Sequence, residues 1–211
     1  MSERDARFWD KTARKYAASP VADEAAFERT LERTRHYLKP SDSVLEFGCG
    51  TGSAALKLAP SAARYVGSDI SGEMIAIARE KAQAAGLANL SFEQAVMNAP
   101  PWPAGSFDAI LGFNIVHLVE DRPRVLENVR NLLKPGGVFV SKTFCLKDSN
   151  PLFRVLVPVM QAVGMAPTVS FLSADQLARE IEAAGFTIVE TQRHGSKTRD
   201  SRPFIVARKT S

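Results

Sequence analysis

Three glycines at alternate positions, Gly48, Gly50 and Gly52, follow a short apolar segment that ends in Glu46 and Phe47. Glycine has no Cβ and tolerates positive φ, so a turn of this composition lets the backbone pass close to a ligand. The spacing departs from the dinucleotide-binding pattern G-x-G-x-x-G, which would place the third glycine at position 53. The glycines alone therefore predict a ligand-binding turn without identifying the ligand.

Asp69 ends the next predicted strand. A carboxylate at this point is where nucleoside-binding α/β folds accept hydrogen bonds from ribose hydroxyls. The alternative is a purely local role, in which Asp69 is an acidic residue favoured by the macrodipole of the helix that begins near Ser71. We favour the ribose ligand.

The elements that must position these residues alternate along the chain. Strands that alternate with helices of ten to fifteen residues indicate βαβ units and a parallel sheet. The last two strands have no helix between them, which predicts one antiparallel member. Hydrophobic periodicity and capping signals predict helices over residues 6–17, 23–38, 53–59, 71–86, 121–133 and 173–184, and strands over residues 44–47, 64–69, 90–95, 107–113, 138–144, 186–190 and 203–207.

Length and composition favour one α/β domain, because 211 residues can bury one sizeable core but not two. The net charge of +4 is a mild excess, part of it between Arg193 and Lys209, and favours a solvated surface over a nucleic-acid site. Cys49 and Cys145 lie far apart and show no metal-ligand spacing, so we predict neither a disulfide framework nor a metal site. The charged N-terminus and the absence of a membrane-spanning stretch lead us to expect a cytoplasmic location.

Four motifs resemble the successive motifs of class I S-adenosylmethionine-dependent methyltransferases: residues 44–52, 67–71, 106–110 and 132–137. The likeness covers about Phe8 to Phe144 and is greatest to the small-molecule branch that includes the quinone-biosynthesis C-methyltransferases. It implies a Rossmann-like, seven-stranded, mostly parallel sheet with one antiparallel strand and helices on both faces. On this basis we divide a single domain into an N-terminal helical cap (1–39), a cofactor-binding core (40–145), a lid-like insertion (146–172) and a C-terminal helix with strands (173–211).

The resemblance also implies roles for individual residues. Gly48 and Gly50 would lie against the methionine part of S-adenosylmethionine, and Asp69 would bind both ribose hydroxyls. Glu46 would orient the turn and meet the cofactor's amino group, while Ile70 would pack on the adenine. The full predicted cofactor-binding set is Tyr16, Glu46, Gly48, Cys49, Gly50, Gly52, Asp69, Ile70, Met74, Val96, Met97 and Asn114.

The adenine end departs from the family pattern. The family usually carries an Asp after the third strand, but alignment backwards from Ser106 places Val96 at that position. We therefore expect backbone groups near Val96 and Met97, together with apolar packing, to recognise the adenine.

Asn114 and His117 follow the fourth strand, where such enzymes place residues near the transferred methyl group. In-line methyl transfer gains about 7 to 11 kcal/mol when donor and acceptor are held in a near-attack geometry, so positioning can supply much of the catalysis. A general base is needed only for an acceptor that arrives protonated. His117 is then the first candidate, although a lone histidine is more often structural.

The insertion from Asn150 to Pro167 is apolar on most predicted helical faces, and Arg154 and Pro158 argue against a membrane span. A buried helix, an acceptor-site lid, a dimer surface and an interfacial helix that contacts a membrane peripherally all remain open. Our hypothesis is a lid, which would favour a small apolar or amphipathic acceptor.

Two other functions remain as alternatives. A nicotinamide-dependent oxidoreductase fits the strand, turn and acidic residue, but the glycine spacing disfavours it. A methyltransferase-like module without catalysis would bind the cofactor, or nothing, and serve as an interaction partner. An RNA or DNA methyltransferase is disfavoured, because the Asn/Asp-Pro-Pro-aromatic motif of amino-methylating enzymes is missing and the basic excess is small.

Overall fold

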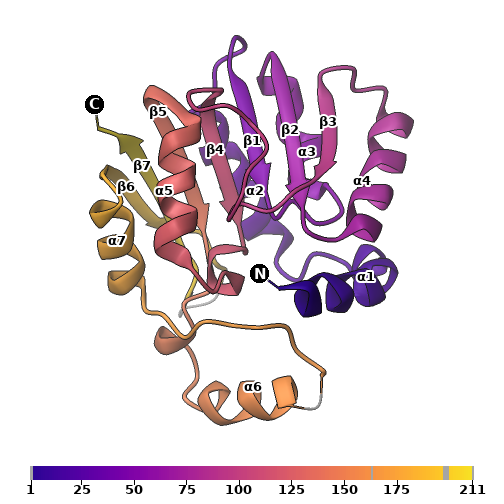
Figure 1. Ribbon diagram of the computed structural model, residues 1–211, viewed down its shortest axis with the longest axis vertical. Helices are drawn as coiled ribbons and strands as arrows, with labels where there is room; N and C mark the ends of the chain where they lie inside the picture. Colours follow the sequence, from indigo (N-terminus) through magenta and orange to yellow (C-terminus); the bar gives the residue numbers. More distant parts are fainter. Residues whose placement is uncertain (1, 163, 197–199, 211) are drawn as a thin grey trace.

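The computed structural model describes residues 2–162, 164–196 and 200–210, and is built around one seven-stranded sheet (Figure 1). The strand order is β3-β2-β1-β4-β5-β7-β6. Strands β1 to β5 are parallel, and β7 pairs antiparallel with both β5 and β6, which confirms the predicted single antiparallel strand. The strands are β1 (Ser43–Phe47), β2 (Arg64–Asp69), β3 (Leu90–Gln94), β4 (Phe107–Phe113), β5 (Leu133–Lys142), β6 (Phe186–Arg193) and β7 (Pro203–Lys209).

Helices cover both faces of the sheet, as the sequence predicts. One apolar cluster joins the sheet to α2, α3 and α4, and a second joins the opposite face to α5 and α7. Successive residues of a strand point to opposite faces of the sheet and so enter different clusters. Val44 packs into the cluster with α2, α3 and α4, and Leu45 packs into the cluster with α5 and α7. The helices are α1 (Glu3–Ala18), α2 (Glu24–Arg35), α3 (Ser53–Leu58), α4 (Gly72–Ala85), α5 (Arg122–Leu132), α6 (Phe153–Ala162) and α7 (Ala174–Ala183).

The strand order reverses between β1 and β4, because the chain leaves β1 toward β2 on one side and returns to β4 on the other. At such a reversal the two connections diverge, and a crevice opens beyond the carboxyl ends of the strands. Helix α1 packs on α4 at this end of the molecule, through a small cluster of Ala13, Met74 and Ile77. The N-terminal helical cap is therefore fixed beside the crevice.

Two local predictions are wrong. The sequence predicts a helix up to Leu133 and a break over residues 134–137, but β5 begins at Leu133, which pairs with Phe107 across an irregularity in the register. A bulge accommodates the Pro-Gly-Gly segment that sequence rules treat as a break. The second error concerns Ser173 and Gln176, whose spacing predicts a capping box at the start of α7. Ser173 accepts from the Gln176 N–H, but the Gln176 side chain does not return to the Ser173 backbone and bonds elsewhere.

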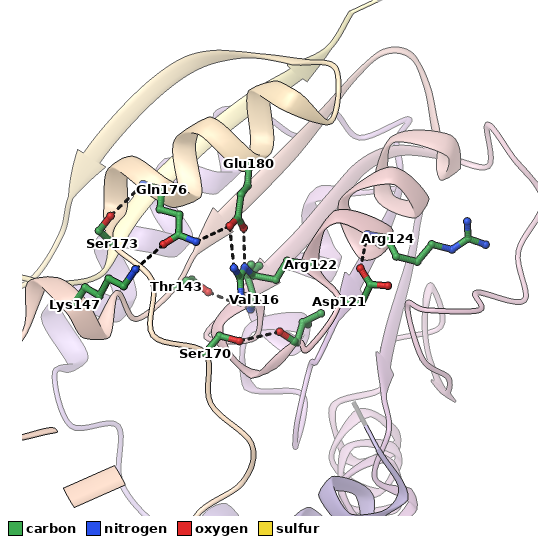
Figure 2. A network of polar contacts seen from close by, with 11 residues as sticks. Val116, Asp121, Arg122, Arg124, Thr143, Lys147, Ser170, Ser173, Gln176 and Glu180 are labelled. Carbon is green, nitrogen blue, oxygen red and sulfur yellow. Dashed lines mark hydrogen bonds and ion pairs between the residues drawn. The ribbon is translucent and has the colours of Figure 1, made fainter. Parts of the chain in front are cut away.

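A polar network holds α5, α7 and the base of the insertion together (Figure 2). Arg122 donates two hydrogen bonds to the Glu180 carboxylate, at 2.7 and 2.8 Å. Gln176 donates to Glu180 and accepts from Lys147, which explains why its amide does not return to Ser173. The two ends of the insertion are thus tied to the same helix.

The insertion between these ends carries α6, which stands apart from the sheet (Figure 1). No residue of α6 is buried, so the buried-helix interpretation is wrong. Its return segment hydrogen-bonds to two neighbours: the Ser170 N–H donates to the His117 carbonyl at 2.7 Å, and the Thr168 N–H donates to Asp5 at 3.0 Å. Among the described residues, no helix is both long enough and apolar enough to cross a bilayer.

Close packing inside the sheet predicts the effect of Gly67→Ala. A Cβ at Gly67 would lie 2.5 Å from the buried Phe92 ring and 3.1 Å from the Cys49 sulfur, so the core must shift. We expect a loss of about 1 to 3 kcal/mol in the free energy of unfolding, measured by urea denaturation. Gly72→Ala is the control, because a Cβ there meets only the flexible Gln94 side chain at 3.4 Å or more and favours the helix; equal destabilisation by the two variants would contradict this account.

Candidate functional site

Two adjoining cavities open at the reversal of strand order. Both contact Gly48, Asp69 and Ile115, so they are two parts of one cleft. The larger part is lined by Trp9, Tyr16, Phe27, Glu46, Gly48, Cys49, Gly50, Thr51, Ser53, Ala54, Asp69, Met74, Phe113, Asn114, Ile115 and Leu118. The smaller part is lined by Phe47, Gly48, Asp69, Ile70, Ala95, Val96, Met97, Asn98, Ile115, Val119 and Val125.

The glycine turn forms the floor between the two parts. Gly48 has φ of +65°, and a Cβ added there would come within 2.4 Å of the Ile115 side chain. Both the backbone angle and the contact with Ile115 therefore require glycine at this position. Gly50, also at positive φ, faces the open cleft, where a Cβ would meet only Tyr16 at 3.8 Å.

The Asp69 carboxylate ties this turn to the next helix. One oxygen accepts from the Gly50 N–H at 3.0 Å and the other from the Ser71 N–H at 2.9 Å. The buried Ser71 hydroxyl caps α4 and donates to Asp10 of α1 at 2.6 Å. Burial raises the pKa of Asp69, while its two backbone hydrogen bonds lower it. The predicted local role and the position expected of a ribose ligand therefore coexist in one side chain.

Glu46 lies beneath the turn and is almost fully buried. Its carboxylate accepts from the Tyr65 hydroxyl at 2.8 Å. Burial raises the pKa of Glu46 to about 7; the Tyr65 hydrogen bond opposes this rise and the negative charge of Asp69 adds to it. The cleft thus holds two acidic groups whose ionisation burial disfavours, and a positively charged ligand would favour the ionised form of both.

The smaller part of the cleft is apolar and formed largely by the loop after β3. Val96 and Met97 line it together with Ile70, and these are the residues for which the sequence predicts contact with adenine. The buried Asn128 of α5 donates to the carbonyls of Met97 and Asn98, at 2.7 and 3.2 Å, and so fixes the loop. The sequence shows no signal for this role, because Asn128 lies in the middle of a predicted amphipathic helix.

Aromatic side chains of three separate segments line the larger part of the cleft. Phe27 comes from α2, Phe113 from the end of β4, and Trp9 and Tyr16 from α1. Asn114 has φ of +54°, a conformation rare for residues other than glycine and better tolerated by Asn than by most. Such backbone strain, next to a cleft, is typical of a functional position.

His117 lies outside the walls of both parts of the cleft. Its ring packs edge-on against Phe144, with centroids 6.2 Å apart, and its buried Nδ1 atom has no hydrogen-bond partner in the described part of the chain. Burial, with a smaller contribution from the positive charge of Arg202, lowers the pKa of His117 to about 4. The imidazole is therefore neutral at pH 7 and a weak base.

The structure brings together most of the predicted cofactor-binding residues at the cleft. Gly52 is the exception, because it lies behind the turn, where a Cβ would collide with Phe92. Sequence reasoning missed the lining contributed by Phe27, Phe113 and Ile115. Helical periodicity assigns Phe27 to a packing face, and only the tertiary fold turns it toward the cleft.

The family model described as "Methyltransferase domain" matches residues 38–185. Demethylmenaquinone methyltransferase of Lactococcus lactis is 28% identical over 178 residues, which cover 72% of this chain and 69% of the relative. A sterol 24-C-methyltransferase of Gibberella zeae is 32% identical, with 78% of this chain and 46% of the relative covered. Phosphoethanolamine N-methyltransferase 1 of Arabidopsis thaliana is 32% identical over 57% of this chain, and that match spans only 26% of the plant protein.

Solved structures share the fold at lower identity. An S-adenosylmethionine-dependent methyltransferase from Mesorhizobium loti superposes with a TM-score of 0.71 at 23% identity, covering 88% of this chain and 98% of the other. The [4+2]-cyclase SpnF has the same TM-score at 18% identity, covering 87% and 80%. These likenesses establish the fold alone, since one of the two proteins is described as a cyclase.

The raised pKa of Glu46 predicts a pH-dependent stability of the ligand-free protein. The folded state holds this proton up to about pH 7, whereas an unfolded Glu releases it near its ordinary value of 4.5. The resulting contribution, on the order of 3 kcal/mol, is present below pH 4.5 and is lost as the pH rises through 7. The Gln side chain of Glu46→Gln does not titrate. The melting temperature of the wild type minus that of this variant should therefore decrease as the pH rises from 5 to 8. If the two melting temperatures change in parallel with pH, the prediction is contradicted.

Proposed function

Because this chain belongs to the class I S-adenosylmethionine-dependent methyltransferases, we propose that it transfers the methyl group of S-adenosylmethionine to a small apolar or amphipathic acceptor. The observation that carries the proposal is the cleft itself. Its floor is a glycine turn held by Asp69, and its lining includes Phe27, Phe113 and other apolar side chains. The chain spans between about a quarter and two thirds of the relatives described above, so the acceptor is proposed from the cleft rather than transferred from them.

The residues of the cleft fit the cofactor at three points. The turn at Gly48 and Gly50 leaves room for the methionine part, and Glu46 beneath it offers a negative charge to an ammonium group. Each Asp69 oxygen accepts one backbone hydrogen bond and keeps a further lone pair for a ribose hydroxyl. Ile70 and Val96 offer an apolar surface to the adenine. When bound, S-adenosylmethionine supplies an electrophilic methyl group activated by its positively charged sulfur.

The chain contributes chiefly by positioning. Asn114 at the end of β4, with Phe113 and Phe27 beside it, would hold the acceptor between the donor site and the apolar wall. Trp9 and Tyr16, on α1, would limit the entry of water. For an acceptor that must lose a proton, His117 is the base that the sequence suggests, but its position outside both parts of the cleft and its pKa of about 4 disfavour that role.

The two alternative functions are not equally supported. Family membership disfavours a nicotinamide-dependent oxidoreductase. A cofactor-binding module without catalysis remains a distinct outcome, because it would retain the same cleft, and it is separated from an enzyme by the transfer experiment below.

Asp69→Ala should weaken the binding of S-adenosylmethionine. Loss of the carboxylate leaves ribose hydroxyls without acceptors, at a cost of about 1 to 3 kcal/mol, or roughly 5- to 150-fold in Kd measured by calorimetry. Asp108→Ala is the matched control: this carboxylate also accepts a backbone N–H, from Ser43, but lies outside the cleft. An unchanged Kd in Asp69→Ala would remove Asp69 from the site.

Incubation with methyl-labelled S-adenosylmethionine and a metabolite or lipid extract should yield one labelled product of apolar or amphipathic character. Mass spectrometry identifies it, and Asp69→Ala provides the low-activity control.

With that acceptor, Phe27→Ala should raise KM by about tenfold while the Kd of the cofactor stays within about twofold. The reason is that the truncation removes apolar contact with the proposed acceptor and leaves the glycine turn intact. Cofactor binding without any labelled product would instead support the non-catalytic module.

A further inference from the structure

One face of α6 is apolar and exposed to solvent. The face consists of three side chains of α6 and of Leu152, which directly precedes it, with exposed fractions from 43% for Leu156 to 67% for Val155. Their spacing along the helix, i, i+3, i+4 and i+7, places all four on one side. We call this set the α6 apolar face: Leu152, Val155, Leu156 and Val159.

The charge of the surrounding segment is unusual. Residues 149–172 contain no Asp or Glu, and Arg154 is their only charged residue. An exposed apolar group of this kind marks a surface that contacts something else. The absence of acidic residues restricts the partner to one that tolerates, or prefers, a neutral to basic surface.

A row of basic residues runs along the neighbouring helix α1. The three acidic residues of α1 do little to neutralise this row. Asp5 is buried and accepts from the Thr168 N–H, and Asp10 accepts from the Ser71 hydroxyl. Glu3 pairs with Arg7, with 3.5 Å between the carboxylate oxygen and the guanidinium nitrogen, and both side chains are exposed to solvent. We call the row the α1 basic stripe; its members are exposed and follow the spacing i, i+3, i+7 and i+10, namely Arg4, Arg7, Lys11 and Arg14.

Direct contacts place the two features side by side. The Arg4 guanidinium donates to the Gln161 carbonyl, near the end of α6, at 2.7 Å. The Thr168 N–H, after α6, donates to Asp5 of α1 at 3.0 Å. Both helices lie toward the lower end of the molecule in Figure 1, and Trp9 and Tyr16 of α1 line the cleft.

We propose that the α6 apolar face and the α1 basic stripe form a docking surface for an anionic phospholipid bilayer. An exposed apolar helical face inserts into the boundary between headgroups and acyl chains, and neighbouring Arg and Lys side chains are attracted to anionic headgroups. A second copy of the chain fits less well, because a symmetric dimer through this surface would bring one basic stripe toward another. The proposal does not depend on methyl transfer.

Packed side chains connect the surface to the region of the cleft. Phe153 at the start of α6 packs edge-on against Phe144, with ring centroids 6.1 Å apart, and Phe144 in turn packs against His117. His117 is the neighbour in sequence of Leu118, which lines the larger part of the cleft.

The test is co-sedimentation of the full chain with vesicles of phosphatidylcholine alone and with about 30% phosphatidylglycerol. Wild-type protein should bind the anionic vesicles, and binding should weaken in 0.5 M salt. Val155→Asp/Val159→Asp should abolish binding, and Arg7→Glu/Lys11→Glu should reduce the partition coefficient by about tenfold or more. All variants are checked by circular dichroism and thermal melting.

Matched controls place the same changes elsewhere. Val189→Asp introduces an acid at another exposed valine, and Arg124→Glu/Arg179→Glu reverses two exposed charges on α5 and α7; both should bind as the wild type does. The proposal is overturned if the wild type sediments with neither vesicle, or if a folded Val155→Asp/Val159→Asp variant binds normally. It is also overturned if light scattering shows a vesicle-independent dimer that this variant converts to a monomer, since a second copy would then cover the face.

Discussion

The Asp69 carboxylate is the contact on which the geometry of the cleft depends. Its two oxygens hold the Gly50 N–H and the Ser71 N–H, so one side chain fixes the turn after β1 against the start of α4. The Ser71 hydroxyl in turn donates a hydrogen bond to Asp10, which lies on α1. The floor, one wall and the cap of the cleft are thus joined through three consecutive hydrogen bonds around the end of β2.

Two neighbouring acidic groups have an electrostatic consequence for the ligand. Burial raises the pKa of both Glu46 and Asp69, and Asp69 raises the pKa of Glu46 further. Burial therefore disfavours the ionised form of both groups in the ligand-free site, and a cationic ligand would favour it. A sulfonium compound with an ammonium group satisfies this requirement, whereas an uncharged nucleoside would leave the two carboxylates uncompensated.

The sequence predicts the core of this fold well, because local signals and tertiary structure agree there. Glycine spacing, the cap at Ser71 and strand–helix alternation together lead to the correct sheet and to most of the residues that meet at the cleft. The incorrect predictions arise where a residue distant in the sequence determines the local structure. Leu133 belongs to a strand because Phe107 pairs with it. The Gln176 side chain does not cap α7 because it bonds to Lys147 and Glu180 instead. Phe27 faces the cleft because α2 packs across the sheet. No local pattern encodes these pairings.

The two ends of the cleft are built with different rigidity. The end that we propose for the cofactor consists of a buried turn and carboxylates tied by hydrogen bonds into the sheet, whereas the end that we propose for the acceptor is lined by side chains of α1, α2 and the end of β4. Changes at the acceptor end alter shape without disturbing the hydrogen bonds at Asp69. The relatives are named for the methylation of demethylmenaquinone, sterol and phosphoethanolamine, which are acceptors of unlike chemistry. For the proposed acceptor, variation at Phe27, Phe113 and Asn114 is the change that the sheet constrains least, because these side chains line the cleft without a hydrogen bond to the glycine turn.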